Sequence, residues 1–245
     1  MKVATRRRIL WGLALALVSV GACGLLTRPL ITRQGVNYRV TSYQIPAYVK
    51  AIDFLQRHYQ YQLLVSRICA GATSEIDCVS AIFEWTHDNV PPTPEGWTVV
   101  DDHVTNIIIR RHGSSDQIAD VFVTLTGYAG VPAVFRWITH PQGNAGLVLA
   151  FARLNEKWVM FDVERRLLFR DRDGQLADVH ALVADPALVD LQSHGTLIKG
   201  HPYSSFVTNK TLLPFTVPSP LRSDMQQPWP RLGYEIKRAI GLESE

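Results

Sequence analysis

The sequence has few of the features that mark a chain built around nucleic acid or metal. Its formal charge is only +3, and apart from Arg6, Arg7 and Arg8 the basic residues are scattered. We therefore expect no DNA or RNA partner. Its three cysteines form no Cys and His pattern with zinc-finger spacing, so we expect no metal site. It also lacks internal repeats and low-complexity tracts, and we expect no cofactor.

Length and composition bound the architecture. A chain of 245 residues fits one folded domain plus an anchor. Hydrophobic residues make up 47% and charged residues 19%, which excludes disorder of the whole chain.

A long uncharged run stands near the N-terminus. Lys2 and the three arginines precede residues 9–26, in which no charged residue occurs. This length lies between a signal-peptide core and a full membrane span. The positive-inside rule places the arginines in the cytoplasm and the chain after Arg28 outside it. We expect a single-pass signal anchor in the lipid bilayer of the inner membrane, with the folded domain in the periplasm.

Two weaker motifs leave other forms of export open. Thr5 to Leu10 resembles a twin-arginine signal, and Val20 to Cys23 resembles a loose lipobox. The chain could therefore be a cleaved lipoprotein with Cys23 lipidated, or a soluble secreted protein. Each alternative places the domain outside the cytoplasm.

Cys69 and Cys78 lie nine residues apart and bracket a turn that contains a helix-start signal. In an oxidising envelope they could form a local disulfide. The alternative is two buried free thiols.

Helical periodicity dominates the first half of the domain. Apolar residues recur at helical spacing over residues 47–59, 73–90 and 114–129. Proline and glycine punctuate residues 91–113, so we expect a loop there, with a short apolar run at 106–109. Residues 28–45 are polar and unpatterned, and we expect a stalk that leaves the membrane.

The second half changes to strand patterns separated by turns, which favours an antiparallel meander and an α+β fold. We expect a short helix over residues 176–184. The C-terminal segment is rich in proline, and we expect it to be extended. The expected strands are residues 133–139, 146–154, 158–163 and 167–170. The expected divisions are the anchor at 1–27, the stalk at 28–45, the domain at 46–185 and the extended segment at 186–245.

Four segments, in order, resemble the bacterial transglutaminase-like family, which shares its core with papain-type cysteine proteases. The resemblance covers about residues 47–185 and implies N-terminal helices packed on an antiparallel sheet. The segments are Ile82 to Val90, Gly113-Ser114-Ser115-Asp116-Gln117, Gly130-Val131-Pro132-Ala133 and Lys157-Trp158-Val159-Met160-Phe161-Asp162.

The resemblance implies a catalytic Cys at a helix N-terminus, a His at a strand opening and an Asp that orients the His. Only the last is kept, as Asp162. Ser115 occupies the Cys position, and no His occurs between Pro141 and Trp158. The site therefore looks degenerate, and we expect no catalytic residues.

Other roles remain open for these residues. His140 or His112 could act as a base for Ser115. Ser115 could instead be the N-cap of its helix. Asp162 could bind backbone amides or an arginine such as Arg136. Five aromatic residues are expected to pack in the core and on the sheet rather than to form a ligand cage: Trp85, Phe135, Trp137, Trp158 and Phe161.

The leading hypothesis is a noncatalytic, membrane-tethered domain that serves as a binding or structural subunit, with a protein partner in the envelope. The second is a Ser-based acyl-transfer or hydrolytic enzyme with Ser115 as nucleophile. The third is an α+β binding module unrelated to the family.

Overall fold

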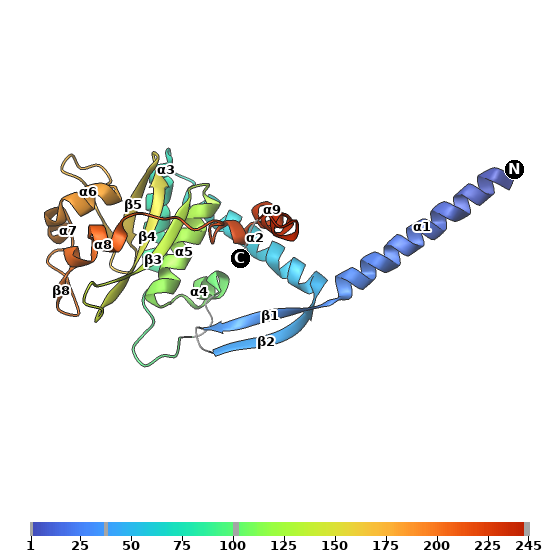
Figure 1. Ribbon diagram of the computed structural model, residues 1–245, viewed down its shortest axis with the longest axis horizontal. Coiled ribbons are helices and arrows are strands. Elements are labelled where there is room, and N and C mark those ends of the chain that lie inside the picture. The colour runs from blue at the N-terminus through green and yellow to red at the C-terminus, as the bar shows by residue number, and fades with distance from the viewer. Residues whose placement is uncertain (1, 37–38, 100–102, 243–245) are drawn as a thin grey trace. The chain divides into compact units, whose positions relative to one another are not determined.

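The computed structural model describes residues 2–36, 39–99 and 103–242, and the chain divides into two compact units, Met1–Arg57 and His58–Glu245 (Figure 1). The boundary falls within α2 (Ala47–Ile68). It therefore lies inside the region that the sequence assigned to one domain starting at residue 46.

The N-terminal unit holds α1 (Lys2–Thr27), β1 (Pro29–Val36) and β2 (Arg39–Pro46). The two strands pair antiparallel, with Pro29 opposite Pro46 and Thr32 opposite Tyr43. This corrects the stalk that was expected at residues 28–45. The segment is polar, but it contains β-branched and aromatic residues that favour strands, and each strand supplies the other's backbone hydrogen bonds.

Among the described residues, no helix is both long and apolar enough to cross a membrane. Residues 9 and 10 are the first two residues of the predicted span at 9–26. Their side chains lie outside the described part of the structure.

A four-stranded antiparallel sheet organises the C-terminal unit. Its strands lie in sequence order: β3 (Ala133–Thr139), β4 (Gly146–Leu154), β5 (Lys157–Asp162) and β6 (Leu167–Leu168). The predicted bounds of β3 and β4 are those of the structure. The helices and this sheet confirm the α+β class.

Helices cover one face of the sheet. They are α3 (Glu75–Asn89), α4 (Val104–Arg110), α5 (Ser115–Tyr128) and the end of α2. Because side chains alternate along a strand, Val148, Ala150 and Ala152 of β4 join this first core. The helix α4 corrects the loop expected over residues 91–113. Its apolar run fills one turn against α5, where Ile107 is fully buried.

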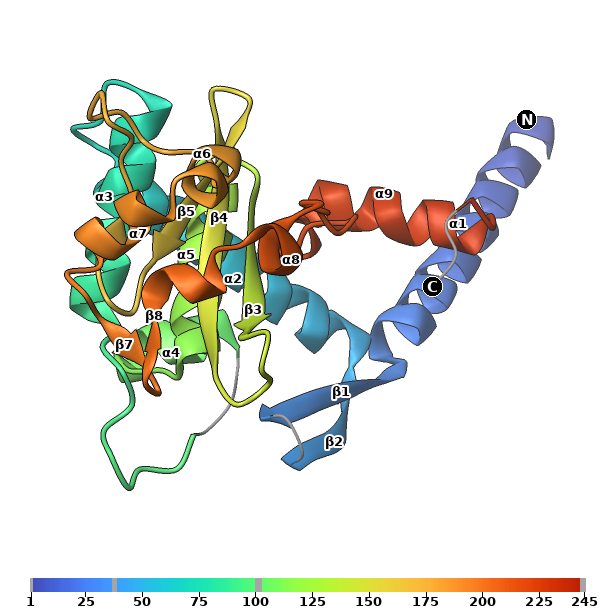
Figure 2. The same cartoon turned by 60° about the vertical axis from the view of Figure 1, so that its left-hand side comes forward.

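The other face is covered by later elements, which Figure 2 displays in front of the strands, with α5 behind them. Leu147, Leu149 and Phe151 of β4 belong to this second core. The covering elements are α6 (Val179–Ala184), α7 (Pro186–Gln192), β7 (Leu197–Ile198), β8 (His201–Pro202), η1 (Tyr203–Phe206) and α8 (Asn209–Leu212). The expected helix at 176–184 thus begins three residues later, after the N-cap Asp178.

The second core corrects the extended segment expected at residues 186–245. Tyr203, Phe206 and Leu212 are fully buried in it. The chain ends in η2 (Asp224–Gln226) and α9 (Pro228–Ala239). Pro228 stands in the first turn of α9, where a missing N–H costs no helical hydrogen bond, so proline there does not prevent a helix.

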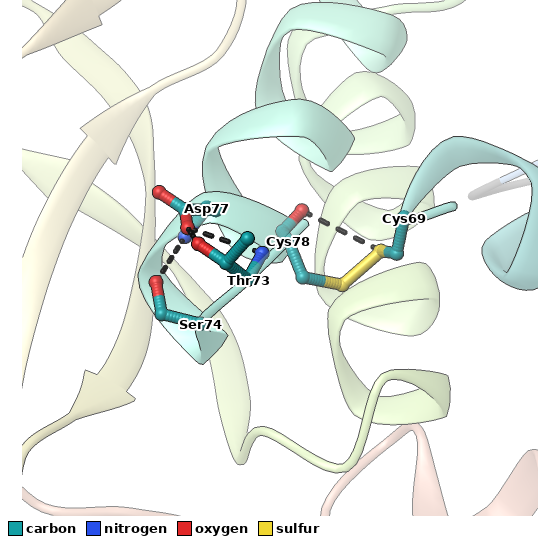
Figure 3. Close-up of a disulfide and its surroundings, with 5 residues drawn as sticks. All are labelled: Cys69, Thr73, Ser74, Asp77 and Cys78. Atoms are coloured by element: carbon teal, nitrogen blue, oxygen red, sulfur yellow. Dashed lines mark hydrogen bonds between the residues drawn. A yellow bond between two sulfur atoms is a disulfide. The ribbon is translucent and has the colours of Figure 1, made fainter. Parts of the chain in front are cut away.

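A disulfide joins Cys69, just after α2, to Cys78 in the first turn of α3, with 4.9 Å between their Cα atoms (Figure 3). Side-chain hydrogen bonds cap the start of α3. The Ser74 hydroxyl accepts from the Asp77 amide at 3.1 Å, and the Asp77 carboxylate accepts from the Thr73 hydroxyl at 2.7 Å. Hydrogen bonds to its carboxylate from the side chain of Thr73, and then from that of Ser74, lower the pKa of Asp77.

Candidate functional site

The start of α5 is the place where the family resemblance puts its nucleophile. Gly113 is anchored to the preceding loop: its amide donates to the Pro91 carbonyl at 3.1 Å, and its carbonyl accepts from the Thr93 amide at 2.8 Å. Ser114 is the N-cap residue, and its amide donates to Gln117 Oε1 at 3.1 Å. Ser115 is therefore the first helical residue, which corrects the assignment of Ser115 as the N-cap. Its side chain is half-buried.

His112 faces the loop before α4 rather than the helix that follows it. Its Nδ1 lies 3.3 Å from the Thr93 hydroxyl, and its ring meets Trp97 edge-on at 5.3 Å between centroids. Its backbone carbonyl accepts from Arg110 Nε at 2.9 Å. These contacts describe a histidine that holds a loop in place.

Asp162 is fully buried and its carboxylate is engaged by three donors. Oδ1 accepts from the Arg165 amide at 3.0 Å, and Oδ2 accepts from Arg165 Nη1 at 3.0 Å and from the Tyr203 hydroxyl at 2.8 Å. Tyr203 belongs to the second core. Phe161, the residue before Asp162 in β5, packs in the first core. The Asp162 side chain thus lies on the face of the sheet away from α5.

Electrostatics keep Tyr203 and Arg165 in their protonated forms. Burial, and then the charge of Asp162, raise the pKa of Tyr203 well above its ordinary value of 10.0, so its hydroxyl stays a donor. Burial alone would lower the pKa of Arg165, but the charges of Asp162 and Glu164 outweigh it and raise the pKa. Charge-assisted hydrogen bonds join the Asp162 carboxylate to Arg165 and to Tyr203.

The arginine beside Asp162 is Arg165 and not Arg136. Arg136 donates to the Leu212 carbonyl at 3.4 Å and lies 5.4 Å from the ring centre of Phe215. Strand β5 turns back to β6 directly after Asp162, and that turn brings Arg165 to its carboxylate. Asp162 therefore pairs with an arginine that is three residues away in the sequence.

His140 follows β3 directly and lies against the C-terminal elements. Its ring stacks on His201 at 3.9 Å between centroids and touches Phe206, and its Nδ1 accepts from the Gln142 amide at 3.2 Å. His201 Nε2 lies 3.0 Å from Asn144 Oδ1. Burial, and then the charge of His201, lower the pKa of His140.

The five aromatic residues separate between the two faces of the sheet. Phe161 meets Phe83 and Phe122 in the first core, where Trp85 and Phe135 also pack. Trp158 packs on Phe215 in the second core. Trp137 is 64% exposed. The five aromatic side chains thus pack in two cores and on the surface and do not form one ligand cage.

The structure does not connect the predicted site residues to one another. Within residues 2–36, 39–99 and 103–242, no hydrogen bond or ion pair joins Ser115 to Asp162, His112 or His140. Sequence reasoning missed Tyr203 and His201, which complete the Asp162 and His140 clusters. Arg165, three residues after a strand-end carboxylate, could have been found from the turn; Tyr203, 41 residues away, carries no local signal.

No group of three or more His, Cys, Asp or Glu side chains in the described part of the chain could hold a metal ion.

No protein-family model matches the chain, and no curated protein matches it significantly. Similar solved structures include the following two. A candidate protease from Parabacteroides distasonis is 13% identical over 54% of this chain and 35% of that chain, with a TM-score of 0.35. A candidate cysteine protease from Cytophaga hutchinsonii is 15% identical over 60% of this chain and 65% of that chain, with a TM-score of 0.38.

This chain thus spans less than two thirds of the length of either protein. Because both TM-scores lie below 0.5, these likenesses assign neither an activity nor a fold family. The α+β class with an antiparallel sheet stands on the elements of this chain.

Proposed function

We propose that the chain is a noncatalytic, membrane-tethered domain outside the cytoplasm that acts as a binding or structural subunit of an envelope complex. The observation that carries the noncatalytic part is Asp162. Its carboxylate accepts hydrogen bonds from Arg165 and Tyr203 on the face of the sheet away from α5. It is therefore not available to orient a histidine beside Ser115, which a Cys- or Ser-type mechanism requires.

We further propose that the domain is a degenerate relative of the transglutaminase-like family. The four motif segments support this, since they fall at α3, the start of α5, the entry to β3 and the length of β5. That order of helix, helix, strand and strand is the order the resemblance implies.

The tether and the compartment belong to the same proposal. The arginines before residues 9–26 favour an anchor with the domain on the far side of the membrane. The Cys69–Cys78 disulfide favours an oxidising compartment, because such bonds rarely persist in the cytosol.

The catalytic question is tested by active-site labelling of the purified full chain. We expect no labelling by a fluorophosphonate in the native protein, the same as in a Ser115→Ala control. In a Cys23→Ser background, Ser115→Cys should alkylate no faster than a thiol at the start of a helix that has no histidine partner, because neither His112 nor His140 is hydrogen-bonded to Ser115. Fluorophosphonate labelling that Ser115→Ala abolishes would replace this proposal with a Ser-based hydrolase or acyltransferase.

The location is tested by fusing paired reporters after Glu245. Alkaline phosphatase, which needs export, should be active, and a reporter that works only in the cytoplasm should not be. The matched control replaces Arg6, Arg7 and Arg8 with glutamine, which should weaken this orientation. Activity of the cytoplasmic reporter alone in the native chain would refute the proposed topology.

A further inference from the structure

Helix α9 presents an apolar face to solvent. Trp229, Leu232, Ile236 and Ile240 follow one another at helical spacings of three and four residues, so they share one side of the helix and of its C-cap. Their exposed fractions are 80%, 50%, 52% and 65%. Four large apolar side chains along one side of α9 are therefore exposed to solvent.

The opposite side of α9 is cationic. It carries Arg231, Glu235 and Arg238, and Lys237 lies at the border between the two sides. These three basic residues and one acidic residue have a net charge of +2. Arg231 pairs with Glu235 at 3.9 Å along the helix. In the sequence Glu243 and Glu245 follow, and they lie outside the described residues.

We propose that α9 lies in the headgroup region of an anionic lipid bilayer, with its apolar face toward the acyl chains. An interfacial helix combines a segregated apolar face that includes Trp with a polar face rich in Lys and Arg. A groove on a protein partner would need the apolar face, but it would not account for the cationic face opposite. The complementary charge for that face is a surface of acidic headgroups.

This contact is separate from the anchor proposed at residues 9–26. An anchor would fix the chain to any bilayer, whereas α9 would add a second contact that depends on lipid charge. Each cation near such a surface contributes about a fivefold preference, so Lys237 and Arg238 together should contribute about 30-fold.

The test reads the environment of α9 in the full chain. In a Cys23→Ser background, the fluorophore NBD is attached at Ile236→Cys, or at Tyr234→Cys on the opposite side as the control. The chain is added to vesicles of phosphatidylcholine alone or of equal parts phosphatidylcholine and phosphatidylglycerol. We expect a blue shift at position 236 on the anionic vesicles only, reversed by high salt, and no lipid-dependent shift at position 234.

Charge variants sharpen the result. Lys237→Gln with Arg238→Gln should lower the binding constant for the anionic vesicles about 30-fold, and Glu243→Gln with Glu245→Gln should raise it. Equal emission at position 236 on both kinds of vesicle would overturn the proposal. A shift that grows with protein concentration and ignores lipid charge would also overturn it, in favour of a second copy of the chain.

Alkaline carbonate extraction of the same vesicles reports on the anchor separately. Complete extraction of a chain that showed the shift at position 236 before extraction would remove the proposed anchor and keep the docking of α9.

Discussion

Asp162 is a single residue whose neighbours decide what it can do. The resemblance assigns it a catalytic carboxylate, but Arg165 and Tyr203 occupy its oxygens in a buried network. A carboxylate held this way stabilises the fold, because its hydrogen bonds are charge-assisted and shielded from water. The roles of the other predicted site residues are likewise decided by contacts such as Thr93 for His112 and His201 for His140.

Asp162→Asn should lower the free energy of unfolding by roughly 2–3 kcal/mol, because hydrogen bonds to a charged group are lost and Arg165 keeps its charge. Tyr203→Phe removes one donor only and should cost roughly 1–2 kcal/mol. Urea denaturation of the full chain measures both. If Asp162→Asn were as stable as the native protein, the carboxylate would have to be kept for another reason.

Acidification should destabilise the domain through His140. Its folded pKa lies below its ordinary value of 6.5, so the unfolded chain binds the proton more readily. The contribution of neutral His140 to the free energy of unfolding is therefore fully present above pH 6.5. It is lost as the pH falls through the pKa of His140 in the folded protein. The pKa of His58 is also lowered, by burial, and contributes in the same direction.

The matched variant is His140→Asn, whose side-chain oxygen can still accept from the Gln142 amide but does not titrate below neutrality. Its urea midpoint should fall less between neutral and acidic pH than that of the native protein. An unchanged pH dependence would mean that His140 is not the titrating group.

The joint between α2 and α3 shows how elements are fixed by short-range features. The disulfide joins the end of one helix to the first turn of the next, and Ser74 caps the second helix. By the loop-entropy relation for nine residues of separation, the bond should contribute about 2–3 kcal/mol.

Cys69→Ser with Cys78→Ser should lose this stability, and native protein treated with a reductant should unfold at the same urea concentration as the double variant. A Cys23→Ser variant serves as the control for the remaining thiol. If reduction left the urea midpoint unchanged, the bond would not contribute to the folded state.

Close packing joins α5 to the segment before η2. A methyl group added at Gly127 would overlap the side chain of Ser223, which is itself buried, and Arg222 pairs with Asp120 of α5 at 2.6 Å. Overpacking of this kind costs about 1–3 kcal/mol, which outweighs the roughly 1 kcal/mol that alanine gains over glycine in a helix.

We therefore expect Gly127→Ala to lower the thermal midpoint. Adding Ser223→Gly should restore it, because the overlapped atoms are removed, and the coupling is read from a double-mutant cycle. Additive effects of the two substitutions would contradict the contact.

At the scale of the molecule, the sheet of the C-terminal unit needs both of its covers. Tyr203, Phe206, Val207 and Leu212 are fully buried on the second face. At about 1.5–3 kcal/mol for each buried side chain, they contribute roughly 6–12 kcal/mol, comparable with the whole stability of a domain.

A chain that ends at residue 185, where the sequence predicts the domain to end, should therefore fail to unfold cooperatively and should bind a hydrophobic dye. A chain that ends at residue 227 keeps the second core and lacks only α9, so it should unfold near the native urea midpoint. Cooperative unfolding of the shorter chain would show that residues 186–227 are dispensable.

The sequence by itself determined the elements that depend on local pattern. Alternation and turns placed β3 and β4 at their bounds, and a cap and a helical period placed α3 and α5, because these signals act within a few residues. Only the tertiary structure decided that a proline-rich tail covers the second face of the sheet, and that Asp162 meets a tyrosine 41 residues away. Local propensity carries no information on such pairs, since packing of the whole chain selects them.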